Sequence, residues 1–460
     1  MIRVVALFLA LVCVLGAGCA KIVEKDENKP AVPSKFSLAQ AVYPEMVPYP
    51  NEMSYTKSNG EFDSDAFYED FTAWRESKNN MQNQYEGYRE GLDGFFTAGI
   101  REYLGDTEGQ NRAYSPLNVF MALAMLAEIT DGESRGQILE LMGKSDIAEL
   151  RRQAKAIWNA NYCADGALTS VMGSSVWLNE NVNFVQETMD SLAENYYASS
   201  FRGTMGSPEF NEALQNWLNE QTGGLLEEQA EGVELSPETV LALATTVYFK
   251  GRWASEFNKN ATTQEQFYLL NDAAESVTCD FMHKSGTNTY YWGDKFSSVE
   301  LRFEGGCSMK LILPDEGVSV DELLTDDEAM RFMLSREGWD NSKFLIVNMS
   351  VPKFDVVSDI DLADGLKGMG ITDVFDTAVS DFTPMTADMD GIAVSQAKHA
   401  ARVTIDEEGC TAAAYTVIAM AGGAMPPDEE VDFILNRPFV FVLTSMDGLP
   451  LFTGVVNNPS

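Results

Sequence analysis

The hydrophobic pattern of the first half of the chain has a helical period. Between residues 92 and 104, apolar side chains fall on one stripe, which predicts an amphipathic helix. The segment 116–126 is apolar nearly all round and follows Ser115, so it predicts a helix that runs through the interior. Further helices are expected over 133–142, which ends before a glycine, and over 208–222.

Strand patterns dominate the second half. The run 240–249 is long and apolar, and its end is rich in β-branched and aromatic residues. Three shorter runs also predict strands: 308–313, 344–351 and 399–405. Runs 439–443 and 451–456 flank the turn dipeptide Asp447-Gly448 and predict a hairpin of two buried strands. Because helices come mainly first and strands mainly later, the order predicts an α+β fold.

The amino terminus predicts an exported protein. Arg3 precedes an apolar run over 4–15, which is too short to span a bilayer comfortably, so residues 1–18 are interpreted as a signal peptide. The sequence LGAGC at 15–19 resembles a bacterial lipoprotein processing site, which implies cleavage before Cys19 and a lipid on its thiol. The alternative is an ordinary cleaved signal, which would leave the protein periplasmic or secreted.

The segment that follows predicts a tether. Residues 20–60 hold five prolines among many polar residues, so 19–85 is interpreted as a lipidated tether and N-terminal extension, mostly extended. The run Lys25-Asp26-Glu27 resembles the surface-export signal of some bacterial lipoproteins. We therefore expect an outer-membrane lipoprotein that faces outward, although a solvated charge cluster in a linker explains the same run. The remaining residues, 86–460, are expected to form one domain.

Composition excludes several function classes. With 32 Lys+Arg against 70 Asp+Glu, the formal net charge is −38, whereas a nucleic-acid binder needs a basic face. The only histidines are His283 and His399, and no nucleophile motif accompanies them, which argues against an enzyme. The cysteines form no CxxC pair, so we expect neither a metal site nor a cofactor.

The segment 406–427 holds the most informative pattern. It is long, carries almost no charge after Glu408 and is flanked by strands. Read with a period of two, one face from Cys410 to Met420 is small or apolar, whereas the other carries Tyr415 and would face outward. The residues alone permit two interpretations, a flexible Gly/Ala loop and a strand able to enter a sheet.

Motifs spread along 86–460 resemble one family. They are SPLN at 115–118, YFKGRW at 248–253, LILPD at 311–315, VPKF at 351–354, LKGMGITDVF at 366–375, SQAKHAARVTIDEEG at 395–409, RPF at 437–439 and GVVN at 454–457. In this order they resemble the serpins. The resemblance implies three β-sheets, about nine helices and an exposed reactive-centre loop. It also implies a suicide protease inhibitor, whose cleaved loop inserts into the main sheet.

The resemblance also assigns site residues. It places the hinge of the loop at Glu407, Glu408, Gly409, Cys410, Thr411, Ala412, Ala413 and Ala414. It places Ser115, Pro116 and His399 in the "shutter", where the sheet opens, and Trp253 in the "breach", where insertion begins. Family spacing from the hinge glycine, and the prolines at 426–427, both put the reactive bond at Gly423-Ala424.

The sequence around the reactive bond suggests the partner. Small residues on both sides suit elastase-like or subtilisin-like serine proteases, with papain-like cysteine proteases as a weaker option. No Lys or Arg occurs in 410–425, which argues against a trypsin-like target. We expect a monomer that meets the membrane only through its lipid.

Several residues depart from the family pattern. Cys410 stands where Thr, Ser or Val is usual, Tyr415 replaces a small residue, and Asn118 and Thr245 replace a typical Ser and Asn of the shutter. Cys410, Tyr415 and the glycine pair at 422–423 keep open a non-inhibitory serpin that acts as an envelope binding protein.

Overall fold

The computed structural model describes residues 5–15, 32–50, 52–57, 61–269, 275–336, 338–410 and 427–460. Within them the expected α+β fold with three sheets is confirmed, and eleven α-helices are present rather than about nine. One of the additional helices, α1 (Ser64–Gln82), lies in the N-terminal extension. Another, α8 (Glu227–Glu231), is a short helix close after α7 (Pro208–Gln221).

The main sheet has the order β13-β14-β1-β7-β5-β6-β2, with β4 and β15 attached at its margins. Its strands are β13 (Phe354–Asp361), β14 (Ile392–Ile405), β1 (Val5–Leu15), β7 (Thr239–Arg252), β5 (Thr169–Asn179), β6 (Ala198–Gly203), β2 (Ser37–Ala39), β4 (Cys163–Ala164) and β15 (Gly409–Cys410). Both neighbours of β1 run parallel to it, so β7 and β14 are parallel to each other.

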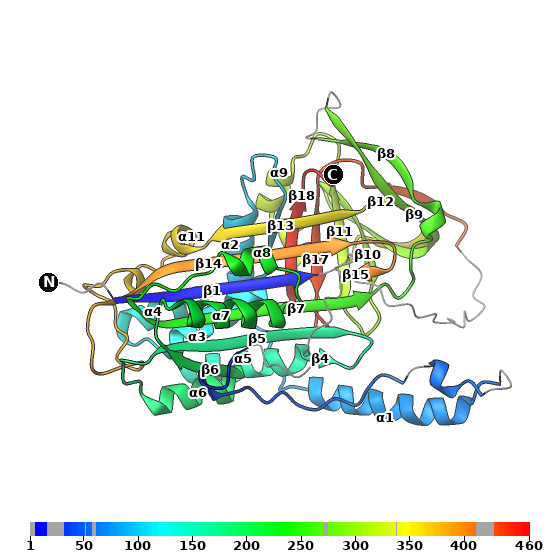
Figure 1. The fold of residues 1–460 in the computed structure, drawn as a ribbon. Helices are drawn as coiled ribbons and strands as arrows, with labels where there is room; N and C mark the ends of the chain where they lie inside the picture. Colours follow the sequence, from blue (N-terminus) through cyan, green and yellow to red (C-terminus); the bar gives the residue numbers. More distant parts are fainter. Residues whose placement is uncertain are drawn as a thin grey trace.

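Two smaller sheets complete the β structure (Figure 1). One contains β16 (Glu430–Ile434), β12 (Ser342–Pro352), β9 (Ser276–Trp292) and β8 (Thr263–Tyr268). The other contains β10 (Phe296–Arg302), β11 (Ser308–Pro314), β17 (Phe439–Thr444), β18 (Pro450–Val456) and β3 (Arg112–Tyr114). Three paired positions between the end of β9 and β10 join them into one ladder. The hairpin predicted from the hydrophobic pattern is β17-β18.

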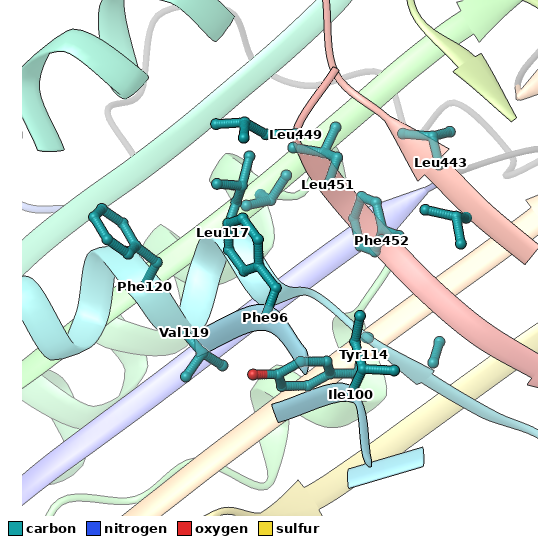
Figure 2. Close-up of a cluster of buried hydrophobic side chains, with 14 of the residues drawn as sticks. Phe96, Ile100, Tyr114, Leu117, Val119, Phe120, Leu443, Leu449, Leu451 and Phe452 are labelled. Carbon is teal, nitrogen blue, oxygen red and sulfur yellow. The ribbon is translucent and has the colours of Figure 1, made fainter. Parts of the chain in front are cut away.

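Helix α3 (Pro116–Glu128) forms the centre of the core, as its uniformly apolar sequence predicts. All its side chains are buried, and Ser115 caps it by accepting a hydrogen bond from the Asn118 N–H at 3.3 Å. Figure 2 shows side chains of α3 beside Phe96 of α2 (Asp93–Leu104) and Phe452 of β18. The other helices are α4 (Gly132–Leu141), α5 (Ile147–Asn161), α6 (Gln186–Tyr196), α9 (Val320–Thr325), α10 (Asp327–Met333) and α11 (Ala363–Gly368).

The main sheet is covered on both faces. Alternate residues of β7 belong to different clusters, because side chains of a strand point to opposite faces. Leu241 and Leu243 lie in the large core with α3, whereas Ala242 and Ala244 lie in a second cluster with Trp217 of α7. A strand in the middle of this sheet is therefore buried on both sides.

The described part of the N-terminal extension lies against the domain. Strand β2 pairs with β6 at the edge of the main sheet. Tyr43 packs against Trp158 and Tyr162, with ring centroids 5.2 and 5.5 Å apart. Helix α1 follows, and the hydrophobic pattern had not predicted it. The prediction that 1–18 is a signal peptide is not tested by this arrangement.

Candidate functional site

The centre of the main sheet contains a position for one additional strand. Strand β1 fills it, pairing with β14 on one side and β7 on the other over nearly its whole length. Leu15, for example, pairs with both Val403 and Phe249. The structure thus shows the sheet open by one strand width, and the occupant is the segment that the sequence predicts to be removed as a leader.

The chain leaving β14 enters the same position from the other end. After a turn, Gly409 pairs with Arg252 and Cys410 with Gly251 in antiparallel register. Strand β1 pairs with β7 as far as Phe249, and β5 takes the other edge of β7 up to Lys250. Strand β15 therefore begins directly beyond the end of β1, on the edge of β7 that faces β14.

The turn between β14 and β15 requires glycine at position 409. Gly409 has φ +128°, a conformation that residues with a side chain rarely adopt. A Cβ there would lie 2.6 Å from the carbonyl oxygen of Gly251. The Asp406 carboxylate closes the turn by accepting hydrogen bonds from the N–H groups of Glu408 and Gly409 at 2.9 and 3.2 Å. Burial is the largest influence on Asp406 and raises its pKa.

Trp253 fixes this turn to the end of β7. Its indole is buried and stacks on Phe303, with ring centroids 4.3 Å apart. The indole Nε1–H donates to the carbonyl oxygen of Asp406 at 2.9 Å, and the backbone N–H donates to that of Glu408 at 3.0 Å. Trp253 thus joins the end of β7 to the turn that precedes β15.

Glu407 supplies a buried charge at the same place. Its carboxylate accepts from Lys353 Nζ at 2.8 Å and from Thr262 Oγ1 at 2.6 Å. Burial alone would raise the pKa of Glu407, but the hydrogen bonds from these two partners outweigh it and hold the pKa below its usual range. Glu408 forms an ion pair with Lys259. The hinge is thus tied to Lys353, directly after β12, and to the segment before β8 by ion pairs and a hydrogen bond.

The other predicted residues meet halfway down the slot. The Ser115 N–H donates to His399 Nε2 at 3.1 Å, and Ser115 Oγ donates to the carbonyl oxygen of Leu451 at 2.6 Å. Asn118 Nδ2 donates to the carbonyl oxygen of Thr245 at 3.4 Å. Burial lowers the pKa of His399 to about 3, so its ring is neutral and, with Nε2 accepting, carries its proton on Nδ1.

Two buried polar atoms flank β1 at this level. His399 Nδ1 and Thr245 Oγ1 have no hydrogen-bond partner among the described residues. Leu11 of β1 pairs with both residues, so they lie in one row of the sheet. Buried polar groups without partners are costly, so this row is an unfavourable feature of the sheet with β1 in place.

The structure therefore divides the predicted site residues between two levels of one slot. Ser115, Pro116 and His399 lie halfway along it, and Trp253 lies with the hinge residues 407–410 at the end where β7 ends. Predictions that fall outside the described residues are Cys19, Thr411, Ala412, Ala413, Ala414, Gly423 and Ala424.

Sequence reasoning missed the contacts of the hinge. Lys353 lies in the motif VPKF, but nothing in the sequence links it to Glu407. The structure makes that link by placing the end of β12 beside the turn after β14. Within the described residues, no group of three His, Cys, Asp or Glu side chains could hold a metal ion, and no helix is long and apolar enough to cross a membrane.

Comparisons with known proteins agree with this geometry. The sequence profile of the family "Serpin (serine protease inhibitor)" matches residues 95–459. Alpha-1-antiproteinase of Rattus norvegicus is 27% identical over 399 residues, which cover 84% of this chain and 93% of that protein. Alpha-1-antiproteinase 2 of Equus caballus is 28% identical over 360 residues, covering 76% of this chain and 82% of that protein.

A solved structure shows the same fold. The thermophilic serpin tengpin, crystallised in the native state, superposes with a TM-score of 0.71 at 24% identity and covers 82% of this chain and 95% of that one. At this identity the likeness concerns the fold alone.

Proposed function

Because the chain belongs to the serpin family, we propose that it is a suicide inhibitor of proteases. In this proposal a protease cleaves the loop between β15 and β16, and the amino-terminal part of the loop inserts into the main sheet. The two curated relatives named above are antiproteinases, and members of the family are generally protease inhibitors rather than enzymes. No comparison favours the non-inhibitory alternative.

The register of β15 is the observation that carries the proposal. Each step of one residue along the loop moves one residue back along β7, because the pairing of Gly409 with Arg252 is antiparallel. If the loop inserted in this register, Gly422 would pair with Thr239, the first residue of β7. The bond Gly423-Ala424 would then fall just beyond the sheet, so all of the loop before it could be inserted.

The same register explains the unusual Tyr415. Tyr415 would pair with Thr246 of β7. Val12 of β1 pairs with both Thr246 and Ala400, so these two residues lie in one row of the sheet. On the far side of Thr246, β5 contributes Gly173. Each neighbour in this row is small, which leaves room for a tyrosine ring on the face covered by α7.

The driving force is the ladder that insertion completes. Roughly a dozen residues would gain hydrogen bonds to both β7 and β14, each worth about 0.5–1.5 kcal/mol net. Apolar side chains on the α3 face would add buried area. In a chain without residues 1–18, only a kinetic barrier would hold the uncleaved loop outside the sheet.

The target is inferred from the loop sequence. The small residues at 421–424 and the absence of Lys and Arg from 410–425 fit an elastase-like or subtilisin-like serine protease, with papain-like proteases second. We further propose that the chain is a bacterial outer-membrane lipoprotein anchored through Cys19. The sequence pattern at 15–19 supports that proposal.

The test is covalent trapping. Residues 19–460, with Cys19→Ser to prevent lipid attachment, would be incubated with elastase and subtilisin. We expect a complex that resists SDS, and mass spectrometry of the released peptide should place the cut at Gly423-Ala424. Degradation by both proteases without such a complex would refute inhibition.

A pair of loop variants separates inhibition from simple cleavage. In the extended register Ala414 would pair with Val247 and face the α3 core, whereas Ala413 would pair with Tyr248, which is half-buried on the α7 face. Ala414→Glu should abolish trapping, because its carboxylate cannot enter the core. The matched variant Ala413→Glu should keep most of it.

A further inference from the structure

A cavity opens where the two smaller sheets separate. Strands β9 and β10 pair at residues 290–292 and 297–299. Earlier in the chain β9 pairs with β12 and β8 instead, so β9 and β10 diverge. Asn288 Nδ2 donates across the gap to the carbonyl oxygen of Glu300 at 3.1 Å, and the cavity beside this bond has a volume of about 520 Å³. Pockets of this size hold small organic molecules in many proteins.

Strand β9 has a residue without a side chain beside this cavity. Gly286 lines it between Lys284 and Asn288, which share a face with Gly286 because alternate residues of a strand point the same way. The φ of Gly286 is not positive, and the ladder with β12 continues through it without a bulge. A Cβ here would meet no described atom within 4 Å beyond its chain neighbours. Since neither conformation nor crowding requires glycine, this residue is typical of a place that another molecule approaches closely.

Lys284 gives the cavity a cation without a carboxylate partner. Its Nζ donates to the carbonyl oxygen of Ser255 and lies 5.5 Å from the centre of the Phe257 ring. Burial lowers the pKa of Lys284 to about 8, and no described carboxylate lies close enough to offset that effect. A chain with 70 Asp+Glu against 32 Lys+Arg therefore leaves this half-buried charge without a counter-ion.

A second cation lines the same cavity. Arg302 is brought beside the lysine by the segment after β7, because the Ala254 N–H donates to the carbonyl oxygen of Arg302 at 2.8 Å and the next residue is Ser255. Among the described lining residues, Glu300 is the single carboxylate. It pairs with Lys310 in the ladder of β10 and β11, and its charge favours the protonated form of that buried lysine. The cavity thus has an excess of positive charge.

Apolar side chains complete the lining. Trp253, Leu301 and Met349 are buried, whereas Phe344 of β12 is 61% exposed. An exposed phenylalanine beside a cavity provides apolar surface that a bound molecule can cover. The lining therefore combines two cations with apolar and aromatic groups, and it would recognise a molecule that has both a negative charge and an apolar part.

We propose that this cavity binds a small organic carboxylate with an apolar body. The carboxylate would pair with Lys284 and Arg302 in charge-assisted hydrogen bonds, and the apolar body would lie over Gly286 against Phe344. A neutral molecule would leave the lysine without a counter-ion, and an inorganic anion would leave the phenylalanine uncovered. The site adjoins the hinge, because Trp253 both lines the cavity and donates to the turn before β15. The proposal does not depend on protease inhibition.

The experiment uses octanoate as the probe and 1-octanol as its neutral analogue. Residues 19–460 with Cys19→Ser would be titrated by calorimetry. We expect octanoate to bind with a Kd on the order of 0.1–1 mM and 1-octanol to bind about tenfold more weakly. Octanoate should also protect Lys284 from acetylation by sulfosuccinimidyl acetate, as measured by mass spectrometry. The exposed Lys343, which pairs with Glu429 and does not line the cavity, should be acetylated equally with and without octanoate.

Three variants test the two parts of the site. Lys284→Met keeps the length of the side chain without its charge, and Arg302→Gln changes an exposed position without touching the core. Each should weaken octanoate binding about tenfold, whereas the control Lys343→Gln should not. Gly286→Leu should abolish binding by filling the space over β9, and urea unfolding would check that it is folded.

The outcomes that overturn the site are equally specific. Absence of octanoate binding at millimolar concentrations overturns it, and so does 1-octanol binding as tightly as octanoate. Equal Kd values for Lys284→Met, Arg302→Gln and the control Lys343→Gln would show that the two cations do not hold the carboxylate. Unchanged binding by a folded Gly286→Leu would place the octanoate elsewhere on the molecule. No protease takes part in these measurements, so the result is independent of whether the chain traps one.

Discussion

His399 of β14 and Thr245 of β7 lie in one row of the main sheet, on either side of Leu11 in β1. Each has a buried polar atom, Nδ1 or Oγ1, that finds no partner among the described residues. Because β7 and β14 are parallel, a sheet that closes over a vacated β1 brings the pair directly opposite each other. The Nδ1–H of a neutral imidazole can then donate to the threonine hydroxyl. A closed sheet would thus provide each of these two polar atoms with a hydrogen-bond partner that it lacks beside β1.

Removal of residues 1–18 should therefore make the protein able to trap a protease. A chain that keeps residues 1–18 has its slot filled by β1, so we expect it to be cleaved by elastase without trapping it. A chain of residues 19–460 should trap the protease. Its thermal midpoint should rise by roughly 10–20 °C after cleavage of the loop, because a completed sheet gains on the order of 10 kcal/mol. Equal trapping by the two chains would show that β1 does not occupy the slot in solution.

Thr245→Val tests the closed row. In the uncleaved 19–460 chain the substitution removes the acceptor for His399 Nδ1, so the free energy of unfolding should fall by about 1–3 kcal/mol. In the cleaved chain an inserted strand already separates the two residues, so the loss should be much smaller. Urea unfolding of both forms measures the difference. An equal loss in both forms would contradict the pairing.

The buried His399 predicts a dependence of stability on pH. Its pKa is lowered to about 3 in the folded chain, against about 6.5 for an unfolded histidine, so the unfolded state binds the proton first as pH falls. The contribution of the neutral ring is complete above about pH 6.5 and is lost progressively toward pH 3, and the loss amounts to about 2 kcal/mol at pH 5.

The comparison of variants isolates this effect from the many carboxylates. The slope of unfolding free energy between pH 5 and 7 should decrease in His399→Asn. The unsubstituted chain is the reference for this comparison. An unchanged slope in His399→Asn would mean that the ring is hydrated in the folded chain.

The sequence predicts those elements whose apolar residues recur with a helical or strand period over a short segment. Helices α2, α3 and α7 and the hairpin β17-β18 follow from apolar spacing within a few residues, because each buries one face in the nearest core. Helix α1 also has buried residues at helical spacing. The many prolines and polar residues before it nevertheless predict an extended tether for the whole N-terminal segment.

Contacts between distant segments could not be predicted in the same way. The ion pair of Lys353 with Glu407 depends on how β12 and the turn after β14 are placed by the whole sheet. The position of β1 depends on the open place between β14 and β7. The apolar sequence of residues 4–15 alone cannot predict that place. The family resemblance did supply Ser115, His399 and Trp253, since those residues recur in fixed motifs.

Gly409→Ala should convert the inhibitor into a substrate. Gly409 has φ +128°, and an added Cβ would lie 2.6 Å from the Gly251 carbonyl oxygen, so alanine must disrupt the turn that starts β15. Insertion would then start late, and the protease would complete hydrolysis more often before it is trapped. We expect the number of inhibitor molecules consumed per trapped elastase to rise several-fold, with the initial rate of loop cleavage unchanged.

Gly94→Ala is the matched control, because a Cβ at this position of α2 meets no atom within 4 Å. It should keep the original stoichiometry and, as a helix substitution, change the free energy of unfolding by no more than about 1 kcal/mol. If Gly409→Ala trapped elastase as efficiently as the control, the paired residues 409–410 would not be the starting point of insertion. The register extended from β15 to the end of β7 would then lose its basis.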